Sequence, residues 1–192
     1  PKLLAANGIQ RDRNSGLRMR GNIAVIPLKG VLMPERNCAS SWNGWTTCDA
    51  FVRDVETAMN DPTVREIVFE VDSPGGCITG IQETAEDIAS CRGRRRLTAH
   101  VDGSCASGAY WLASAADEIV TGVTGEVGCI GVVTTYARSK GDTKTFVSTQ
   151  SPMKRPDIDS EEGAAAVQAV IDQLAEVFIA DVTKNRGVSR EK

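Results

Sequence analysis

Residues 70–76 read EVDSPGG, a run in which a short apolar strand passes into a turn. Glycines 75 and 76 have no Cβ atom, so the backbone there can approach a ligand closely and can direct successive N–H groups into a cleft. Paired N–H groups of this kind are what an oxyanion site requires. A Pro-Gly-Gly turn can also serve chain geometry alone, so this stretch by itself leaves both interpretations open.

The sequence on both sides of this turn alternates short apolar runs with amphipathic helical patterns. Strands are expected at residues 23–28, 67–71, 97–101, 118–123 and 144–148. Helices are expected from Asp49 to Asn60, over residues 79–90, and from Asp159 or Ser160 to just before Gly187. This alternation predicts an α/β fold built from right-handed βαβ units.

The last of these helices is the longest. Glu162 is available for a capping box at its start. Apolar residues then recur at helical spacing at Val167, Val170, Ile171, Leu174, Val177 and Phe178. The preferred interpretation is a plain helix that packs on the core.

Composition bounds the organisation of the chain. With 192 residues, of which 41% are hydrophobic, the sequence predicts one domain with a substantial core. Residues 1–20 are polar, lack an apolar period and are expected to form a flexible arm, which leaves residues 21–192 as a single domain. A net charge of -3 gives no electrostatic basis for binding nucleic acid or an anionic membrane. The basic run Arg92–Arg96 is interpreted as a solvated loop without a role.

The chain offers no expected metal or cofactor site. Its six cysteines are scattered, with no Cys-x-x-Cys pair and no neighbouring histidine, so reduced structural thiols are expected. No run of 18 apolar residues is present, and the first residues lack the layout of a secretory signal. A soluble, cytoplasmic protein with no membrane partner is the expectation.

Residues 101–111 read VDGSCASGAYW, which leaves a predicted strand and enters a helix of small residues. A serine at this junction, Ser107, lies where a helix N-terminus favours developing negative charge, and its small neighbours leave room for a substrate backbone. Serines at helix starts are usually N-caps, but Ser104 is better placed for that duty. Ser107 is therefore a candidate nucleophile.

His100 is the one histidine in the chain and the one candidate for the base of a Ser-His-Asp triad. It lies on the predicted strand seven residues before Ser107. Strand alternation places it on one sheet face with Thr98 and Asp102, from which it cannot easily reach the Ser107 hydroxyl. A triad based on His100 is therefore disfavoured.

Several motifs together resemble the signal peptide peptidase A family of serine peptidases, and most closely its phage prohead and capsid-assembly branch. They are DSPGG at residues 72–76, ASGAY at 106–110, AADEI at 115–119 and GEVGCIGV at 125–132. The family commonly has serine where this chain has Cys129. The resemblance covers roughly residues 22–190.

The resemblance implies a Clp-protease or crotonase-like fold of stacked ββα units with a mostly parallel sheet, and assembly into homo-oligomers. It implies a Ser-Lys dyad with Ser107 as nucleophile and an oxyanion hole made by the backbone N–H groups of Gly75, possibly Gly76, and Gly108. It also implies a chain that continues beyond residues 185–187, so the domain would be truncated at its C-terminus.

The base implied by the resemblance is Lys154, in the loop SPMKRPD at residues 151–157, because phage relatives carry Ser-Pro-x-Lys-Arg-Pro-Asp at this position. Longer family members show Ser-Gly-x-x-Lys, which this chain lacks. Lys140 and Lys144 are the alternatives. The implied activity is a serine endopeptidase that processes phage scaffold or head proteins, in the host cytoplasm or the prohead interior.

Two other functions remain open at this point. A crotonase-type acyl-CoA enzyme shares paired oxyanion amides but uses Glu or Asp in place of Ser and Lys. A catalytically silent assembly protein would keep the fold as an oligomeric platform.

Overall fold

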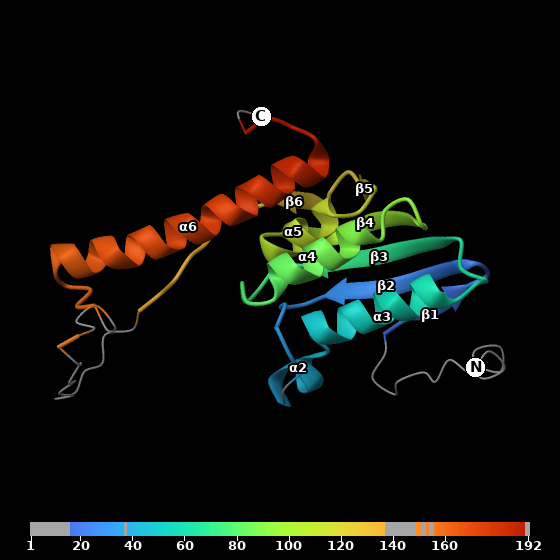
Figure 1. Cartoon of the computed structure of the whole chain (residues 1–192). Coiled ribbons are helices and arrows are strands. Elements are labelled where there is room, and N and C mark those ends of the chain that lie inside the picture. The colour runs from blue at the N-terminus through green and yellow to red at the C-terminus, as the bar shows by residue number, and fades with distance from the viewer. Residues whose placement is uncertain (1–15, 37, 137–148, 151–152, 154–155, 191–192) are drawn as a thin grey trace.

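The computed structural model describes residues 16–36, 38–136, 149–150, 153 and 156–190. Its centre is one sheet with neighbouring strands in the order β1-β2-β3-β4-β5, and β6 pairs with the far end of β4 (Figure 1). Only the β1–β2 pair is antiparallel among the described strands, so the predicted mostly parallel α/β sheet is confirmed. The strands are β1 (Arg18–Arg20), β2 (Ile23–Lys29), β3 (Glu66–Ser73), β4 (Arg96–Ala106), β5 (Glu118–Thr121) and β6 (Glu126–Gly128).

Four of the five predicted strands are confirmed as β2, β3, β4 and β5. The fifth, at residues 144–148, lies outside the described residues. β4 continues five residues beyond its predicted end at Val101, because a register shift against β3 lets it accommodate extra residues between Val101 and Cys105. The strands β1 and β6 have three residues each, too few for a hydrophobic period to reveal them.

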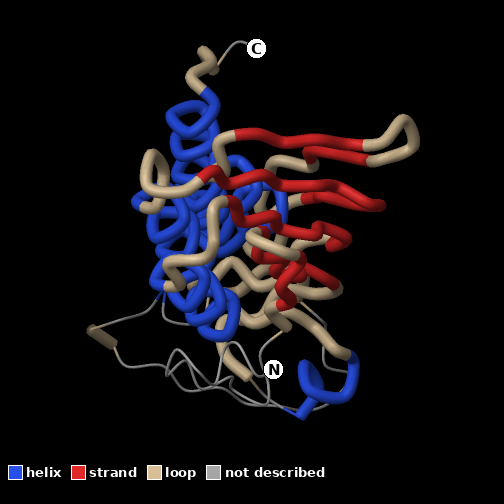
Figure 2. Tube along the Cα trace, turned by 90° about the vertical axis from the view of Figure 1, so that its right-hand side faces the viewer, coloured by secondary structure: helices blue, strands red, loops and turns tan. Residues whose placement is uncertain are grey.

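Most of the helices lie on one face of the sheet, as Figure 2 shows. They are α2 (Cys38–Asn43), α3 (Cys48–Asn60), α4 (Ile81–Ser90), α5 (Gly108–Ser114) and α6 (Glu161–Arg186). The core lies between these helices and the inward residues of β2, β3 and β4, such as Ile26, Phe69 and Leu97, which are fully buried. The predicted helices at 49–60, 79–90 and 160–186 are thereby confirmed within two residues at each end.

Charged side chains occupy the sheet face that no helix covers. Glu70 accepts contacts from Lys29 at 2.9 Å and from Arg18 at 2.6 Å, across three strands. The hydrogen bond from Lys29, followed by the one from Arg18, lowers the pKa of the Glu70 carboxyl. Arg96 similarly bridges Glu118 at 2.6 Å and Glu66 at 3.8 Å. These cross-strand pairs let a mostly parallel sheet, usually covered on both faces, leave one face polar.

The ordered domain begins before the predicted boundary at Gly21. Leu17 is 2% exposed and belongs to the core, and β1 pairs with residues 23–25 of β2. Residues 16–20, assigned to the arm from their polar sequence, therefore belong to the folded domain, and residues 18–20 of this segment pair in the sheet. The pattern concealed this because the strand is short and two of its three residues are arginines that point outward.

The long helix α6, predicted to pack on the core, does so only through its C-terminal part, where Phe178 and Val182 are buried. Phe178 is buried, but Val167, Ile171, Leu174 and Val177 are half-buried and Val170 is 56% exposed. The capping box with Glu162 is also not formed. Ser160 is the N-cap, and its Oγ accepts the N–H of Gly163 at 3.0 Å.

Arg92, assigned to a solvated loop, is instead a structural residue. Its guanidinium donates to the carbonyl oxygens of Ser114, Ala115 and Ala116 at 2.7–2.8 Å. It also donates to the Asn185 carbonyl at 3.1 Å. These acceptors include the unpaired carbonyls at the end of α5 and one near the end of α6, so a single side chain ties the two helix ends together.

We expect Arg92→Ala to lower the free energy of unfolding by about 3 kcal/mol, because four carbonyl groups lose a charged donor in a partly buried site. The melting temperature should fall by roughly 6–12 °C. Arg94→Ala, at an exposed arginine two residues away, is the matched control and should leave stability within about 0.5 kcal/mol of wild type. Urea unfolding followed by circular dichroism measures both, and equal stability of the two variants would contradict the assignment.

Candidate active site

Ser107 is the single residue between the end of β4 and the start of α5. Its backbone has φ 53° and ψ -127°, a conformation that L-residues rarely adopt and that costs about 1–3 kcal/mol. A sharp strand-to-helix turn of this kind projects a serine side chain out of the fold at the edge of the sheet. Among the serines of the described residues, Ser107 is the one with a positive φ.

The backbone of Ser107 is fixed from both sides while its hydroxyl is free. Its N–H donates to the Gly128 carbonyl at 2.8 Å, and its carbonyl accepts the N–H of Trp111 at 3.0 Å. It occupies the N-cap position, yet its side chain makes no capping hydrogen bond. In the described part of the chain the hydroxyl has no partner. Ser104, expected to be the cap, lies within β4 instead, because the strand runs on to Ala106.

Gly75 brings the Pro-Gly-Gly turn directly against Ser107. A Cβ atom at position 75 would lie 2.7 Å from the Ser107 Cβ, 2.8 Å from the Ala106 carbonyl oxygen and 2.9 Å from the Gly108 nitrogen. Its φ of +92° also disfavours any side chain. The two motifs singled out in the sequence, thirty residues apart, therefore meet at one point.

The amides around Ser107 differ in their availability. The Gly75 N–H donates to Ser73 Oγ at 3.1 Å, so it is already engaged. For Gly76 and Gly108, the described residues provide no acceptor for the backbone N–H. Gly108 is the first residue of α5, where N–H groups have no intrahelical acceptor. Of the three glycines expected to form an oxyanion hole, Gly76 and Gly108 thus offer unpaired donors, and Gly75 provides the close approach.

Ser73 holds this turn in place, a role that the sequence did not reveal. It is fully buried, accepts the Gly75 N–H, and donates its own hydroxyl to the Gly30 carbonyl at 2.6 Å. The signal available in the sequence was its position immediately before Pro74. That position is compatible with a simple turn residue and so did not distinguish it.

Cys129 lies beside Ser107 at the end of the neighbouring strand. β6 pairs with β4 in parallel, with Ala106 opposite Gly128, so the next residue along β6 is adjacent to Ser107. Cys129 is exposed and has φ 58°. Apart from Ser107, it is the one non-glycine residue with positive φ in the described ranges. This is the position where the resembled family commonly has serine.

All six cysteines are free, as expected. Burial raises the pKa of the Cys105 thiol, two residues before Ser107, to about 12. This thiol therefore stays protonated at neutral pH and does not compete with Ser107 as a nucleophile. Among the described residues, no group of histidines, cysteines and acids is arranged to hold a metal ion.

Of the candidate bases, the structure describes only His100. Lys154, Lys140 and Lys144 lie outside the described residues. His100 is exposed in the middle of β4, with Glu70 and Val120 as its register partners on the neighbouring strands. No described contact links it to Ser107, in agreement with the expectation from strand alternation.

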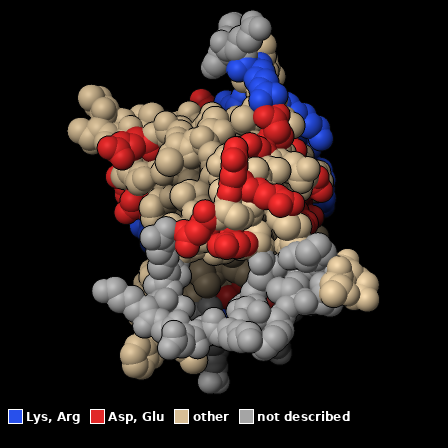
Figure 3. Space-filling model, turned by 90° about the vertical axis from the view of Figure 1, so that its left-hand side faces the viewer, with Lys and Arg blue, Asp and Glu red and all other residues tan. Residues whose placement is uncertain are grey.

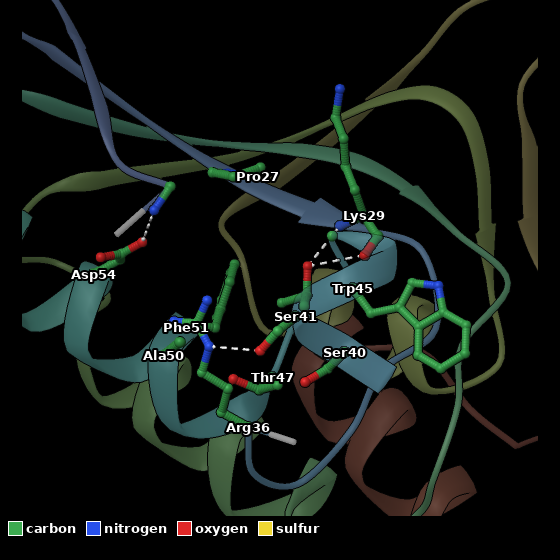
Figure 4. Close-up of a pocket in the computed structure, with 13 residues that line it drawn as sticks. Pro27, Lys29, Arg36, Ser40, Ser41, Trp45, Thr47, Ala50, Phe51 and Asp54 are labelled. Carbon is green, nitrogen blue, oxygen red and sulfur yellow. Dashed lines mark hydrogen bonds between the residues drawn. The ribbon is translucent and has the colours of Figure 1, made fainter. Parts of the chain in front are cut away.

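A separate cavity of about 230 Å³ opens beside the end of β2 (Figure 4). Its lining includes Lys29, Arg36, Trp45, Phe51 and the largely buried Asp54, which accepts the Gly16 N–H at 3.1 Å. Arg36 is held by a 3.0 Å hydrogen bond to Ser41 Oγ. Neither Ser107 nor any of the three glycines lines this cavity. The cavity is therefore separate from the candidate active site around Ser107.

Comparison with curated proteins finds relatives among phage and bacterial proteins. The chain is 31% identical over 124 residues to the head-tail preconnector protein GP5 of Enterobacteria phage P21, covering 65% of this chain and 25% of that protein. It is 33% identical over 123 residues to Protease 4 of Salmonella typhi, covering 62% and 19%. It is 28% identical over 120 residues to the capsid assembly protease C of Escherichia phage lambda, covering 62% and 27%. The chain thus spans about a quarter or less of the length of these relatives.

Solved structures similar to this chain include enoyl-CoA hydratases, which have the crotonase fold named by the resemblance. The enoyl-CoA hydratase from Polaromonas sp. JS666 is 19% identical, with a TM-score of 0.47, covering 58% of this chain and 49% of that chain. A crotonase from Legionella pneumophila is 15% identical, with a TM-score of 0.42, covering 58% and 49%.

A family match gives the chain its classification. It extends over residues 92–192, which include Ser107, α5 and α6. This is more than half of the chain, and the strained serine at a strand-helix junction lies within it. The chain belongs to peptidase family S49.

Proposed function

We propose that this chain carries the catalytic centre of a serine endopeptidase in which Ser107 is the nucleophile and Lys154 the general base. The observation that carries the proposal is the junction of β4 and α5. There a strained serine, whose hydroxyl has no partner among the described residues, packs against the turn at Gly75. Within the same described residues the N–H groups of Gly76 and Gly108 have no acceptor. Membership of a peptidase family supports a peptide as the substrate.

The reaction begins when Ser107 Oγ attacks the carbonyl carbon of a peptide bond while the base accepts the hydroxyl proton. The carbonyl oxygen becomes an oxyanion, which the N–H groups of Gly76 and Gly108 stabilise, with Gly75 allowing the close approach. The tetrahedral intermediate collapses, the base returns its proton to the departing amine, and an ester remains on Ser107. Water, deprotonated by the same base, then releases the acyl group.

Lys154 can act as base only if it is neutral near pH 7. Its pKa must then be lowered by about three units from the usual 10.4 through desolvation, which corresponds to roughly 4 kcal/mol. The assignment rests on the resemblance of the SPMKRPD loop at residues 151–157 to the Ser-Pro-x-Lys-Arg-Pro-Asp pattern given in the sequence analysis. Because the neutral form increases with pH, the reactivity of Ser107 should rise with pH up to the pKa of this lysine.

The proposed substrates are phage structural proteins. Two of the relatives bear names that place them in capsid assembly or at the head-tail junction of a phage. By this proposal the chain processes scaffold or head polypeptides in the host cytoplasm or inside an assembling prohead.

We expect a fluorophosphonate probe to add once to the wild-type chain, as measured by intact mass between pH 6 and pH 10. Ser107→Ala should abolish the adduct, and Lys154→Ala should slow labelling at least about 10³-fold, because both act as one unit. Ser104→Ala, a nearby serine within β4, is the matched control and should label like wild type.

The outcomes of this labelling separate the alternatives. Undiminished labelling of Lys154→Ala would reject it as base and turn attention to Lys140, Lys144 and His100. Labelling of Ser107→Ala would reject Ser107. Absence of an adduct at every pH would favour a catalytically silent assembly protein.

A second prediction concerns the glycine turn. Gly75→Ala should reduce labelling by about 10²-fold, because its Cβ would press on the Ser107 Cβ and the Gly108 nitrogen and displace the attacking atom. Gly122→Ala is the control, since a Cβ there meets nothing within 4 Å. Wild-type labelling by a folded Gly75→Ala variant would show that the close approach is unimportant.

A further inference from the structure

Residues 30–32, here called the strap, run from the end of β2 alongside the glycine turn. The Leu32 N–H donates to the Gly75 carbonyl at 2.9 Å, and the Leu32 carbonyl accepts the Cys77 N–H at 2.9 Å. The two backbones are so close that a Cβ atom at Gly76 would lie 2.1 Å from the Leu32 carbonyl oxygen. Gly76 carries one of the two proposed oxyanion donors, so the position of that donor depends on the strap.

Gly30 is the residue of the strap that holds Ser73. Its carbonyl accepts the Ser73 hydroxyl at 2.6 Å, and Ser73 Oγ in turn accepts the Gly75 N–H at 3.1 Å. The Gly30 N–H donates to the Asp72 carbonyl at 3.0 Å. Gly30 has φ +66°, a backbone conformation that few residues other than glycine adopt. Because glycine has many accessible conformations, contacts from outside the strap help to select this one.

Trp45 supplies such a contact. A Cβ atom at Gly30 would lie 2.6 Å from Trp45 Cδ1 and 3.4 Å from Trp45 Nε1, so the edge of the indole lies directly against the Gly30 backbone. Figure 4 shows this indole beside the Lys29 end of β2. Trp45 is half-buried and lies in the loop between α2 and α3. Its ring fills the space beside Gly30 and restricts the backbone there.

Thr46 fixes the position of this indole. Its Oγ1 accepts the Lys29 N–H at 2.8 Å and donates to the Lys29 carbonyl at 3.0 Å. The Thr46 N–H also donates to the Lys29 carbonyl at 3.0 Å, and the Thr46 carbonyl accepts the Met33 N–H at 3.1 Å. Thr46 is thus bonded to the residues before and after the strap, which keeps Trp45 against Gly30.

We propose that Trp45 is a positioning residue for the oxyanion hole. Its indole holds Gly30 in the conformation that directs the Gly30 carbonyl to Ser73. The strap and Ser73 then keep the Gly76 N–H at the distance from Ser107 that an oxyanion requires. The inference rests on the proposed function of Ser107. The effect passes through the strap, so Trp45 is not itself a catalytic residue.

Charge does not complicate a test at Trp45. Figure 3 views the molecule from the side toward which β2 runs in Figure 1, and acidic side chains gather on that face. A change of charge there would alter the reactivity of Ser107 through the electrostatic field alone. Trp45→Ala and Trp45→Phe leave the net charge unchanged, so an effect of either on labelling arises from packing.

Rates of fluorophosphonate labelling test the proposal. Trp45→Ala should slow formation of the Ser107 adduct about tenfold, because the Gly76 donor loses its fixed distance, while the final stoichiometry stays at one adduct. Trp45→Phe keeps an aromatic ring against Gly30 and should label within about threefold of wild type. Val64→Ala removes a buried side chain before the start of β3. It is the control for lost stability, and once folded by circular dichroism it should label like wild type.

A double-mutant cycle tests the contact itself. Gly30→Ala should slow labelling more than Gly21→Ala, since both glycines have positive φ, of 66° and 61°, but a Cβ at Gly21 meets nothing within 4 Å. Removing the indole relieves the overlap at Gly30. Gly30→Ala should therefore slow labelling at least about threefold less in the Trp45→Ala background than in wild type. Equal slowing in both backgrounds would show that the indole does not act on Gly30.

Hydrogen exchange of the glycine turn is a readout that does not depend on peptidase activity. The N–H groups of Gly75 and Cys77 are hydrogen-bonded, one to a side chain of the turn and one to the strap. In Trp45→Ala their exchange rates should rise about tenfold, measured by mass spectrometry of peptides covering residues 70–80. The Val64→Ala control should change these rates much less.

Two further outcomes would overturn the proposal. They are a wild-type labelling rate in folded Trp45→Ala, and unchanged hydrogen exchange of the glycine turn in the same variant. If wild type forms no adduct, the proposed function of Ser107 fails, and hydrogen exchange alone decides whether Trp45 orders the turn.

Discussion

The contact between Gly75 and the Ser107–Gly108 backbone is the constraint on which the candidate site depends. Atoms of two chain segments approach so closely that a single methyl group at position 75 would overlap three of them. This contact fixes the distance from the glycine turn to the serine. The distance matters for the chemistry, because backbone amides stabilise a developing oxyanion only when they are held at a fixed distance from the nucleophile.

The sheet produces this contact through an irregularity in the pairing of β3 and β4. Their register is regular up to Val71 and Val101, and then shifts so that Ser73 pairs with Cys105. Asp72 stabilises the extra residues by accepting the N–H of Ser104 at 3.1 Å. The shift lets β4 reach the level of the Pro-Gly-Gly turn, so that Ser107 emerges beside Gly75 and not short of it.

The sequence predicted most of the elements and singled out Ser107 because local patterns encode both. Apolar runs marked β2 to β5, and small residues around Ser107 marked a crowded strand-helix junction. Partners distant in the chain escaped prediction, since no local pattern specifies them. Arg92 finds its acceptors on two helices, and Ser73 reaches Gly30 across the sheet edge. The apolar residues at helical spacing in α6 indicate that one side of this helix packs against something, but they do not indicate which surface covers it.

Trp111 links the C-terminal part of α6 to the candidate nucleophile. Its indole ring stacks on Phe178 and so anchors the C-terminal part of α6. Its backbone N–H donates to the carbonyl of Ser107, the N-cap residue of α5. Arg92 then joins the ends of the same two helices. Because α5 is only seven residues long, it has little stability of its own and relies on these contacts. The packing of α6 therefore supports the helix that follows Ser107, so the long helix and the backbone of the candidate nucleophile depend on the same contacts.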